Sequence, residues 1–227
     1  MKPERVLALD ISSKTGWVSA VSSASGMVLK EYGTLEVIHE PEGSYPSNYV
    51  LWAYECFTDI LQLMDRYTPD VLVIEETSRG SKNAMSQKIL EWIHFLVAQH
   101  LRVMDKLRSV YLMTEEWRRE IGCKMTDGEK GKNKAVRDYK KAYLKKHGKE
   151  TTIAYDINGK RIGLSGKKHV NVRRANEIFG DQLKEPLILK DEDLADALGL
   201  LACYHFRRLK VGKAKEVSME DLIGDKL

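Results

Sequence analysis

Residues 5–22 read RVLALDISSKTGWVSAVS, and this stretch decides the fold. Its first third is a short apolar run that ends on a carboxylate, Asp10, and an alternating pattern resumes after a turn-rich segment. This arrangement predicts two strands joined by a tight turn. The sequence SSASG at 22–26 predicts a second turn, and residues 27–37 predict a third strand. We therefore expect the chain to begin with a three-stranded antiparallel meander.

Helix and strand patterns alternate after the meander. Apolar residues recur at spacings of three and four over residues 49–67, which predicts an amphipathic helix. The run VLVI at 71–74 predicts a strand that is buried on both faces. A long helix is expected over 84–107 and a fifth strand over 110–113. This order predicts an α/β fold of the ribonuclease H-like class, with a mixed sheet flanked by helices.

The second half of the chain is strongly basic. Further helices are expected over 115–121, 134–146, 170–179 and 192–209, with a hairpin over 151–164 around Asn158-Gly159. Residues 124–174 hold 16 basic and 5 acidic residues, a net charge of +11, whereas the rest of the chain carries −7. This asymmetry predicts a basic surface that faces nucleic acid, and a merely solvated lysine-rich helix is the alternative.

Composition limits the class of protein. The chain has 227 residues, of which 43% are hydrophobic and 31% charged, and this excludes wholesale disorder. No apolar stretch approaches the roughly 20 residues of a spanning helix, and three scattered cysteines indicate neither a disulfide framework nor a zinc site. We expect a cytoplasmic protein with one domain over 1–210, a basic insertion at about 148–168 and a charged tail over 211–227.

Acidic residues stand where elements begin or end. Asp10 ends the first strand, Glu75 ends the fourth, and Asp193 and Asp196 lie three residues apart near the start of the last helix. Carboxylates gathered in one cleft would repel one another without a divalent cation, and oxygen ligands favour Mg²⁺, with Mn²⁺ as a substitute. The pattern therefore predicts a two-metal phosphoryl-transfer site.

Each acid also has a plainer interpretation. Asp10 is equally typical of a turn, and Asp193 of a helix cap. Glu76 directly follows Glu75 and competes with it as the inward ligand, although Glu75 is closer to the strand. Asp191 competes with Asp193, but it lies outside the D-x-A-D frame.

Three motifs resemble those of a known family. The sequences LDISSKTGW at 9–17, VIEE at 73–76 and DLADAL at 193–198 are similar to those of the RuvC-type Holliday junction resolvases, especially their phage-borne relatives. The resemblance covers residues 5–209. It implies a ribonuclease H-like fold, a homodimer and Mg²⁺-dependent nicking of two strands of a four-way DNA junction. The metal ligands that it implies are Asp10, Glu75, Asp193 and Asp196.

The resemblance also implies basic residues near the scissile phosphate, with Lys134 or Lys168 as the catalytic lysine. The basic hairpin is expected to contact a junction arm, with a solvated loop as the alternative. The residues expected to bind DNA are Ser12, Lys14, Arg79, Lys82, Lys124, Lys132, Lys134, Lys160, Arg161, Lys167 and Lys168.

The favoured hypothesis is a crossover junction endodeoxyribonuclease that acts as a homodimer on branched DNA. The helix over 84–107 is expected to supply the dimer face through its apolar residues Ile89, Trp92, Ile93, Leu96 and Val97. A junction-binding protein without cleavage is one alternative. A phosphotransferase of the actin and sugar-kinase type is another, although the chain lacks the second glycine-rich phosphate loop that those proteins need.

Overall fold

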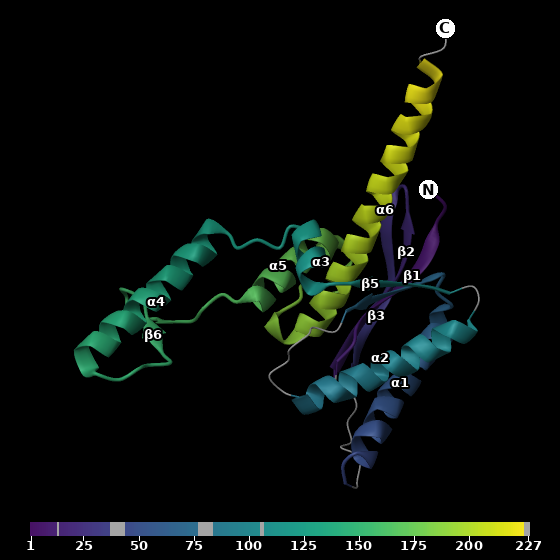
Figure 1. Ribbon diagram of the computed structural model, residues 1–227. Helices are drawn as coiled ribbons and strands as arrows, with labels where there is room; N and C mark the ends of the chain where they lie inside the picture. The colour runs from purple at the N-terminus through teal and green to yellow at the C-terminus, as the bar shows by residue number, and fades with distance from the viewer. Residues whose placement is uncertain (13, 37–43, 77–83, 105–106, 225–227) are drawn as a thin grey trace.

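A five-stranded mixed sheet with the strand order β3-β2-β1-β4-β5 lies at the centre of the protein (Figure 1). The first three strands, β1 (Glu4–Asp10), β2 (Lys14–Ser23) and β3 (Gly26–Glu36), form the predicted antiparallel meander. This computed structural model describes residues 1–227 except 13, 37–43, 77–83, 105–106 and 225–227, and for 84–86 and 212–224 it describes the backbone alone.

Two parallel strands complete the sheet. β4 (Val71–Glu75) pairs with β1, and β5 (Arg108–Leu112) pairs with β4 on its other side. Leu9 is paired with Ile74 in the register, so β1 and β4 end at the same edge of the sheet. This pairing brings the residues that follow the two strands next to each other.

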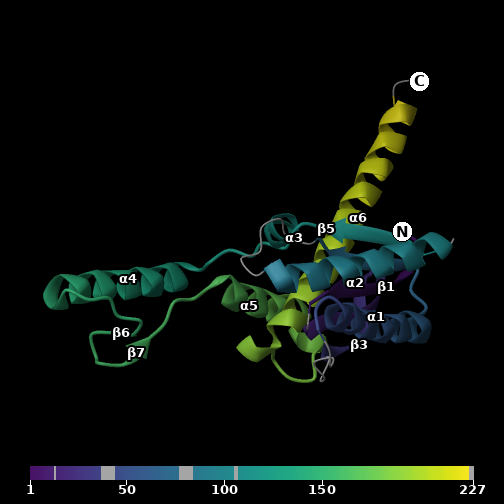
Figure 2. The same cartoon turned by 60° about the horizontal axis from the view of Figure 1, so that its bottom comes forward.

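Two helices cover one face of the sheet. Alternate residues of a central strand point to opposite faces, and Leu7 and Leu9 of β1 point towards this layer. The layer consists of α1 (Ser47–Tyr67) and α2 (Ala84–Val103), which lie side by side in Figures 1 and 2. Burying these apolar side chains is the main stabilising contribution to this half of the core.

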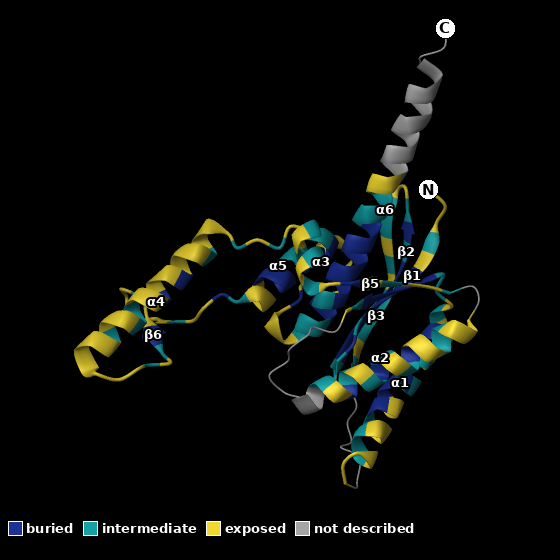
Figure 3. Ribbon diagram, viewed as in Figure 1, coloured by how far each residue is buried: buried dark blue, intermediate teal, exposed yellow. Residues whose placement is uncertain are grey.

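The opposite face is covered by α3 (Thr114–Glu120), α5 (Lys167–Phe179) and α6 (Glu192–Gly224). Val6 and Ala8 of β1 point towards this layer and join its core. Figure 3 shows the buried residues gathered along the sheet and the inward sides of these helices. None of the helices in the described part of the chain is long and apolar enough to cross a membrane.

The prediction that the most apolar residues of α2 form a dimer face is wrong, because the same chain buries them. Ile89, Ile93 and Val97 are at most 6% exposed, and they pack in the core between α2, α1 and the sheet. Trp92 and Leu96 pack against the same cluster and are partly buried. The spacing of these residues predicts a buried stripe, but it does not say whether the same chain or a second copy covers the stripe.

A basic arm stands away from the sheet and its helices (Figures 1 and 2). It consists of α4 (Asp127–His147) and the hairpin of β6 (Ala154–Tyr155) and β7 (Arg161–Ile162), and we call these elements the arm. Val136 of α4 and Ala154 are nearly inaccessible to solvent, so the arm has a small core of its own. Figure 3 shows that most of α4 is otherwise exposed.

Two helices are longer than the sequence pattern predicts. α4 begins at Asp127 rather than at 134, because a capping box starts it there: the amide of Glu129 donates to Thr126 Oγ1 (3.2 Å), and the amide of Thr126 donates to Glu129 Oε2 (2.7 Å). α6 continues past the predicted end at 209 to Gly224. The expected connector over 180–190 contains two short 3₁₀ turns, Gly180–Gln182 and Leu189–Asp191.

Replacing Asn133 with alanine is expected to loosen the arm. The buried Asn133 amide donates to the backbone carbonyl of Ser165 (2.9 Å) and accepts from its backbone amide (2.7 Å), which ties α4 to the segment before α5. Without both bonds, the buried backbone groups of Ser165 have no partner, which lowers the free energy of unfolding by about 1–3 kcal/mol. Hydrogen exchange should speed up at the Ser165 amide and in the hairpin.

Asn176→Ala is the matched control, because Asn176 makes the same pair of bonds to the backbone of Leu187 (2.9 and 2.8 Å). It should speed up exchange at Leu187 and leave Ser165 protected. Equal protection of Ser165 in both variants would show that Asn133 does not hold the arm.

Candidate metal site

Three acidic side chains from distant parts of the sequence converge at one edge of the sheet. Asp10 is the last residue of β1, Glu75 is the last residue of β4, and Asp196 lies in the first turns of α6. One carboxylate oxygen from each residue lies within 4.8 Å of the others. The parallel pairing of β1 and β4 accounts for the first two, and the placement of α6 accounts for the third.

A glycine on β2 lets α6 approach this edge. A Cβ atom on Gly16 would lie only 2.0 Å from the backbone oxygen of Asp193. No side chain fits in that space, so the start of α6 lies directly against the β2 backbone. Gly199 permits a second close approach about two turns later, because a Cβ there would lie 2.5 Å from the Trp117 ring. These two contacts set the position from which Asp196 reaches the edge.

The carboxylates lie in an environment that disfavours their charged forms. Burial raises the pKa of Asp10 well above its usual value, and the negative charges of Glu75 and Asp196 raise it further. Burial also raises the pKa of Asp196, to about 6, although the Arg118 guanidinium and a hydrogen bond from Asn171 act in the opposite direction. A bound cation would relieve this repulsion, so the site is suited to a metal ion.

Neighbouring side chains fix the orientation of two of these acids. Asn171 Nδ2 donates to Asp196 Oδ1 (2.6 Å), and an Nη atom of Arg118 donates to Oδ2 (3.3 Å). Thr114 Oγ1 donates to a carboxylate oxygen of Glu75. These three residues come from α5 and α3, so both helices help to position the ligands.

Arg118 and Asn171 each keep an unused polar atom. Within the described part of the chain, the buried Arg118 Nε and Asn171 Oδ1 have no hydrogen-bond partner. Arg118 also stacks over the Trp117 ring, with its guanidinium carbon 5.0 Å from the ring centroid. Arg118 and Asn171 line a pocket of about 340 Å³ together with residues from the base of the arm.

The other acidic candidates lie outside this cluster. Asp193 is not among the three residues whose oxygens lie within 4.8 Å of one another. Burial and the charge of Glu192 raise the pKa of Asp193, and Lys14 and Lys168 act to lower it. Glu76 is exposed, so Glu75 is the inward acid of this pair. Asp191 caps a 3₁₀ turn, where its carboxylate accepts from the backbone amide of Ile188 (2.9 Å).

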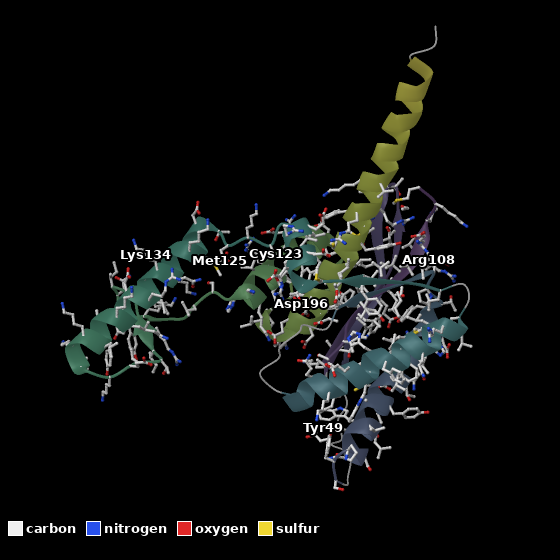
Figure 4. The ribbon with its side chains drawn as sticks, viewed as in Figure 1. Tyr49, Arg108, Cys123, Met125, Lys134 and Asp196 are labelled. Carbon is white, nitrogen blue, oxygen red and sulfur yellow. The ribbon has the colours of Figure 1, made fainter. Side chains whose placement is uncertain are left out.

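The two candidate lysines occupy different places. Lys134 lies on α4 in the arm, well apart from Asp196 (Figure 4). Lys168 lies in the first turn of α5 and forms an ion pair with Glu192, the residue before Asp193. The charge of Lys168 also acts to lower the pKa of Asp193, which lies three residues before Asp196.

The remaining DNA-binding candidates fall into four groups. Lys132, Lys160 and Arg161 lie in the arm, and Lys124 and Lys167 line the pocket at its base. The hydroxyl of Ser12 donates to the backbone oxygen of Lys14 (2.8 Å) and stabilises the turn after β1. Arg79 and Lys82 lie outside the described residues.

Sequence reasoning missed Arg118, Asn171 and Thr114. It looked for acidic and lysine residues, and none of these three belongs to a motif that the chemistry requires. Two signals were available: Arg118 follows the fully buried Trp117 on a short helix, and Asn171 occupies the apolar side of α5 between Val170 and Val172. A polar side chain on a buried helix face needs a partner, and here the partner is a candidate ligand.

Neither a protein-family model nor a curated protein sequence matches the chain. Its structure, however, is similar to solved structures. Thermus thermophilus RuvC in complex with a Holliday junction substrate is 11% identical, with a TM-score of 0.55 over 89% of this chain and 93% of that chain. The yeast mitochondrial Holliday junction resolvase is 12% identical, with a TM-score of 0.54 over 95% of this chain and 85% of that chain.

These similarities concern the fold, because the sequence identities are low. They confirm the fold class that the order of elements predicts, with β1, β4 and β5 parallel and helices on both faces of the sheet. The chain has a ribonuclease H-like fold as in RuvC, with three acidic side chains gathered at the edge where β1 and β4 end.

Proposed function

We propose that this protein is a structure-selective endonuclease that resolves Holliday junctions and related branched DNA by hydrolysing phosphodiester bonds. The observation that carries the proposal is the convergence of Asp10, Glu75 and Asp196 at the edge of a fold shared with junction resolvases. One of the two similar structures is a RuvC bound to a Holliday junction substrate and the other is a Holliday junction resolvase, which supports branched DNA as the substrate. The three motifs are similar to those of phage-borne relatives, which supports a protein that acts inside a bacterial or phage-infected cell.

The donor set fits a hard divalent cation, Mg²⁺ with Mn²⁺ as a substitute. All three ligands are carboxylates, and burial together with the charges of Glu75 and Asp196 raises the pKa of Asp10, an effect that a bound cation would offset. When bound, such ions activate water for attack on the phosphate and stabilise the charge that develops on the leaving oxygen. Asp10, Glu75 and Asp196 would hold them, and Asp193 would join from the first turn of α6 as the fourth acid.

The chain's own residues orient this site. Asn171 and Arg118 fix the two oxygens of Asp196, and Thr114 fixes Glu75. Ligands that are held before the metal arrives lose little conformational entropy on binding it. The Arg118 guanidinium also keeps a positive charge beside Asp196, which would help to offset negative charge on the substrate's phosphate.

We assign the catalytic lysine to Lys168 rather than Lys134. Lys168 lies beside the acidic cluster, whereas Lys134 lies out on the arm. Its ammonium group would offset charge on the phosphate during the reaction. Lys14, Lys124 and Lys167 would hold the DNA backbone near the site, and Lys132, Lys160 and Arg161 would hold it along the arm.

A homodimer follows from the need for two symmetric cuts across one junction. Its interface would use the outer side of α2 and the edge strand β5, where Phe95 (57%) and Tyr111 (40%) are exposed and line one pocket. Sedimentation at micromolar concentration without DNA should give a dimer, and a monomer would contradict this part of the proposal.

The proposal is tested with a labelled immobile four-way junction and a linear duplex of matched sequence, each in Mg²⁺ and in EDTA. Paired nicks are expected on the junction alone, only with Mg²⁺, and should disappear in Asp196→Asn. The products should carry 5′-phosphate and 3′-hydroxyl ends.

Two other results would contradict the proposal, and each would favour a different function. Tight junction binding without cleavage, equal in Ca²⁺ and Mg²⁺, would indicate a protein that recognises junction shape without cutting. If neither DNA is bound, a nucleotide-binding assay would test the phosphotransferase alternative.

A further inference from the structure

One face of α4 carries a stripe of basic side chains. Lys134, Arg137, Lys141 and Lys145 follow one another at spacings of three and four residues, so they lie on one side of the helix. All four are exposed. We call these four residues the α4 stripe.

The α4 stripe points away from the rest of the arm. The opposite side of α4 packs on the hairpin: Val136 is buried there, and the Tyr139 ring contacts Tyr155 with their centroids 5.9 Å apart. Asn133 on the same side is bonded to the backbone of Ser165. The stripe is therefore not needed to hold the arm together.

Acidic side chains of the arm do not neutralise the α4 stripe. Asp127 pairs with Lys130, and Glu129 with Arg173 of α5, while the Asp156 carboxylate accepts backbone amides in the hairpin turn. In the described part of the chain, none of the four stripe residues has an acidic partner within ion-pair distance. Asp138 lies on the same face, four residues after Lys134, so this exposed face carries four cations and one anion and keeps a net charge of +3 that favours a polyanion.

The dimensions of the α4 stripe match duplex DNA. Eleven residues separate Lys134 from Lys145, which is about 16 Å along a helix that rises 1.5 Å per residue. Phosphates of one strand follow the duplex axis at about 3.4 Å per step, so the stripe spans about five of them. Lys124 and Lys167 at the base of the arm extend the basic surface towards Lys168 and the acidic cluster.

We propose that the α4 stripe is a second DNA-binding surface, which holds the backbone of a duplex arm of the substrate at a distance from the site of cleavage. This inference rests on the proposed function for the identity of the branched substrate. The stripe sets affinity and its salt dependence, and it takes no part in the chemical step.

The test compares two triple variants with equal loss of charge. One is Arg137→Gln, Lys141→Gln and Lys145→Gln in the α4 stripe, and the control is Lys140→Gln, Lys146→Gln and Lys149→Gln on other sides of the arm. Glutamine is close to lysine and arginine in helix propensity, so both should fold, and circular dichroism checks this. Junction binding is measured by fluorescence anisotropy in EDTA at several salt concentrations, where cleavage plays no part.

The stripe variant should bind the junction at least about tenfold more weakly at 0.1 M salt. Its plot of log affinity against log salt should be shallower by 2 to 3, since each lost phosphate contact contributes a slope of about 0.9. The control should change the slope by less than about 1. Single-turnover cleavage at saturating protein should stay within about twofold of the wild type for the stripe variant, because the chemistry is untouched.

Equal affinities and slopes for the wild type and the stripe variant would overturn the inference, and so would an equal loss in the control. Tighter binding of an RNA duplex than of the junction, lost in the stripe variant, would assign the surface to RNA instead. Because binding is read without cleavage, failure of the wild type to cut junctions would count against the proposed function and leave the stripe result interpretable.

Discussion

Replacing Asp10 with asparagine is expected to abolish junction cleavage, by roughly 1,000-fold or more, while making the metal-free protein more stable. Activity falls because the variant loses a metal ligand. Stability rises because Asp10 is buried beside Glu75 and Asp196, where a charge is costly. We expect the free energy of unfolding in EDTA at neutral pH to rise by about 1–2 kcal/mol, measured by urea denaturation.

The pH dependence of this effect has a definite sign. The pKa of Asp10 is raised in the folded protein, so its contribution to stability is fully present below its unfolded pKa and is lost as pH rises through the folded value. The gain in Asp10→Asn should therefore vanish in acid and grow towards neutral pH. Mg²⁺ should stabilise the wild type and have little effect on the variant.

Glu76→Gln is the matched control, because it removes one negative charge from an exposed neighbour of Glu75. It should keep cleavage activity and leave the stability in EDTA nearly unchanged. A lower stability of Asp10→Asn than of the wild type in EDTA at neutral pH would contradict the conclusion that burial and the neighbouring acids disfavour the charged form of Asp10.

Replacing Arg118 with alanine is the second change with a large expected effect. Arg118 donates to Asp196, and its charge lowers the pKa of that carboxyl against the effect of burial. Without it the Asp196 carboxylate loses one of its two hydrogen-bond donors and the positive charge beside it. We expect single-turnover cleavage to fall by roughly 100-fold, with junction affinity in EDTA little changed.

A pH profile separates this role from a structural one. The pKa of Asp196 is about 6 with Arg118 in place, so Arg118→Ala should raise it and move the acid limb of the rate profile to higher pH. Arg118→Lys should restore part of the rate, since lysine keeps the charge but not the planar guanidinium. Arg119→Ala on the same helix is the control, and a profile shifted as far in that variant would contradict the assignment.

The sequence pattern predicts all three clustered acids with their elements, but only for two of them does the topology also explain why they lie close together. Asp10 and Glu75 end apolar strands, and parallel neighbours in a sheet end at the same edge, so their proximity follows from the topology. Asp196 depends on where α6 begins and how closely it approaches β2. That approach is set by Gly16, whose role emerges only when the two segments are brought together.

The predictions about Asp193 and α4 show what local patterns lack. Residues three apart on a helix share a broad face, and the charge of Asp193 raises the pKa of both Asp10 and Asp196. Its oxygens nevertheless lie outside the 4.8 Å group that Asp196 joins, and helix spacing alone does not give that difference in reach. The capping-box residues Thr126 and Glu129 predict the start of α4, but the glycines that follow Thr126 favour a loop over the same stretch. The arm itself depends on contacts between α4 and a hairpin distant in sequence, which no local pattern encodes.

Anomalous scattering from crystals soaked in Mn²⁺ would show whether Asp10, Glu75 and Asp196 form a metal site. The wild type should show an ion at about 2.1 Å from an oxygen of each carboxylate, and Asp10→Asn crystals should show it weakened or absent. A wild-type protein that cleaves junctions in Mn²⁺ but binds no ion at this edge of the sheet would contradict the account.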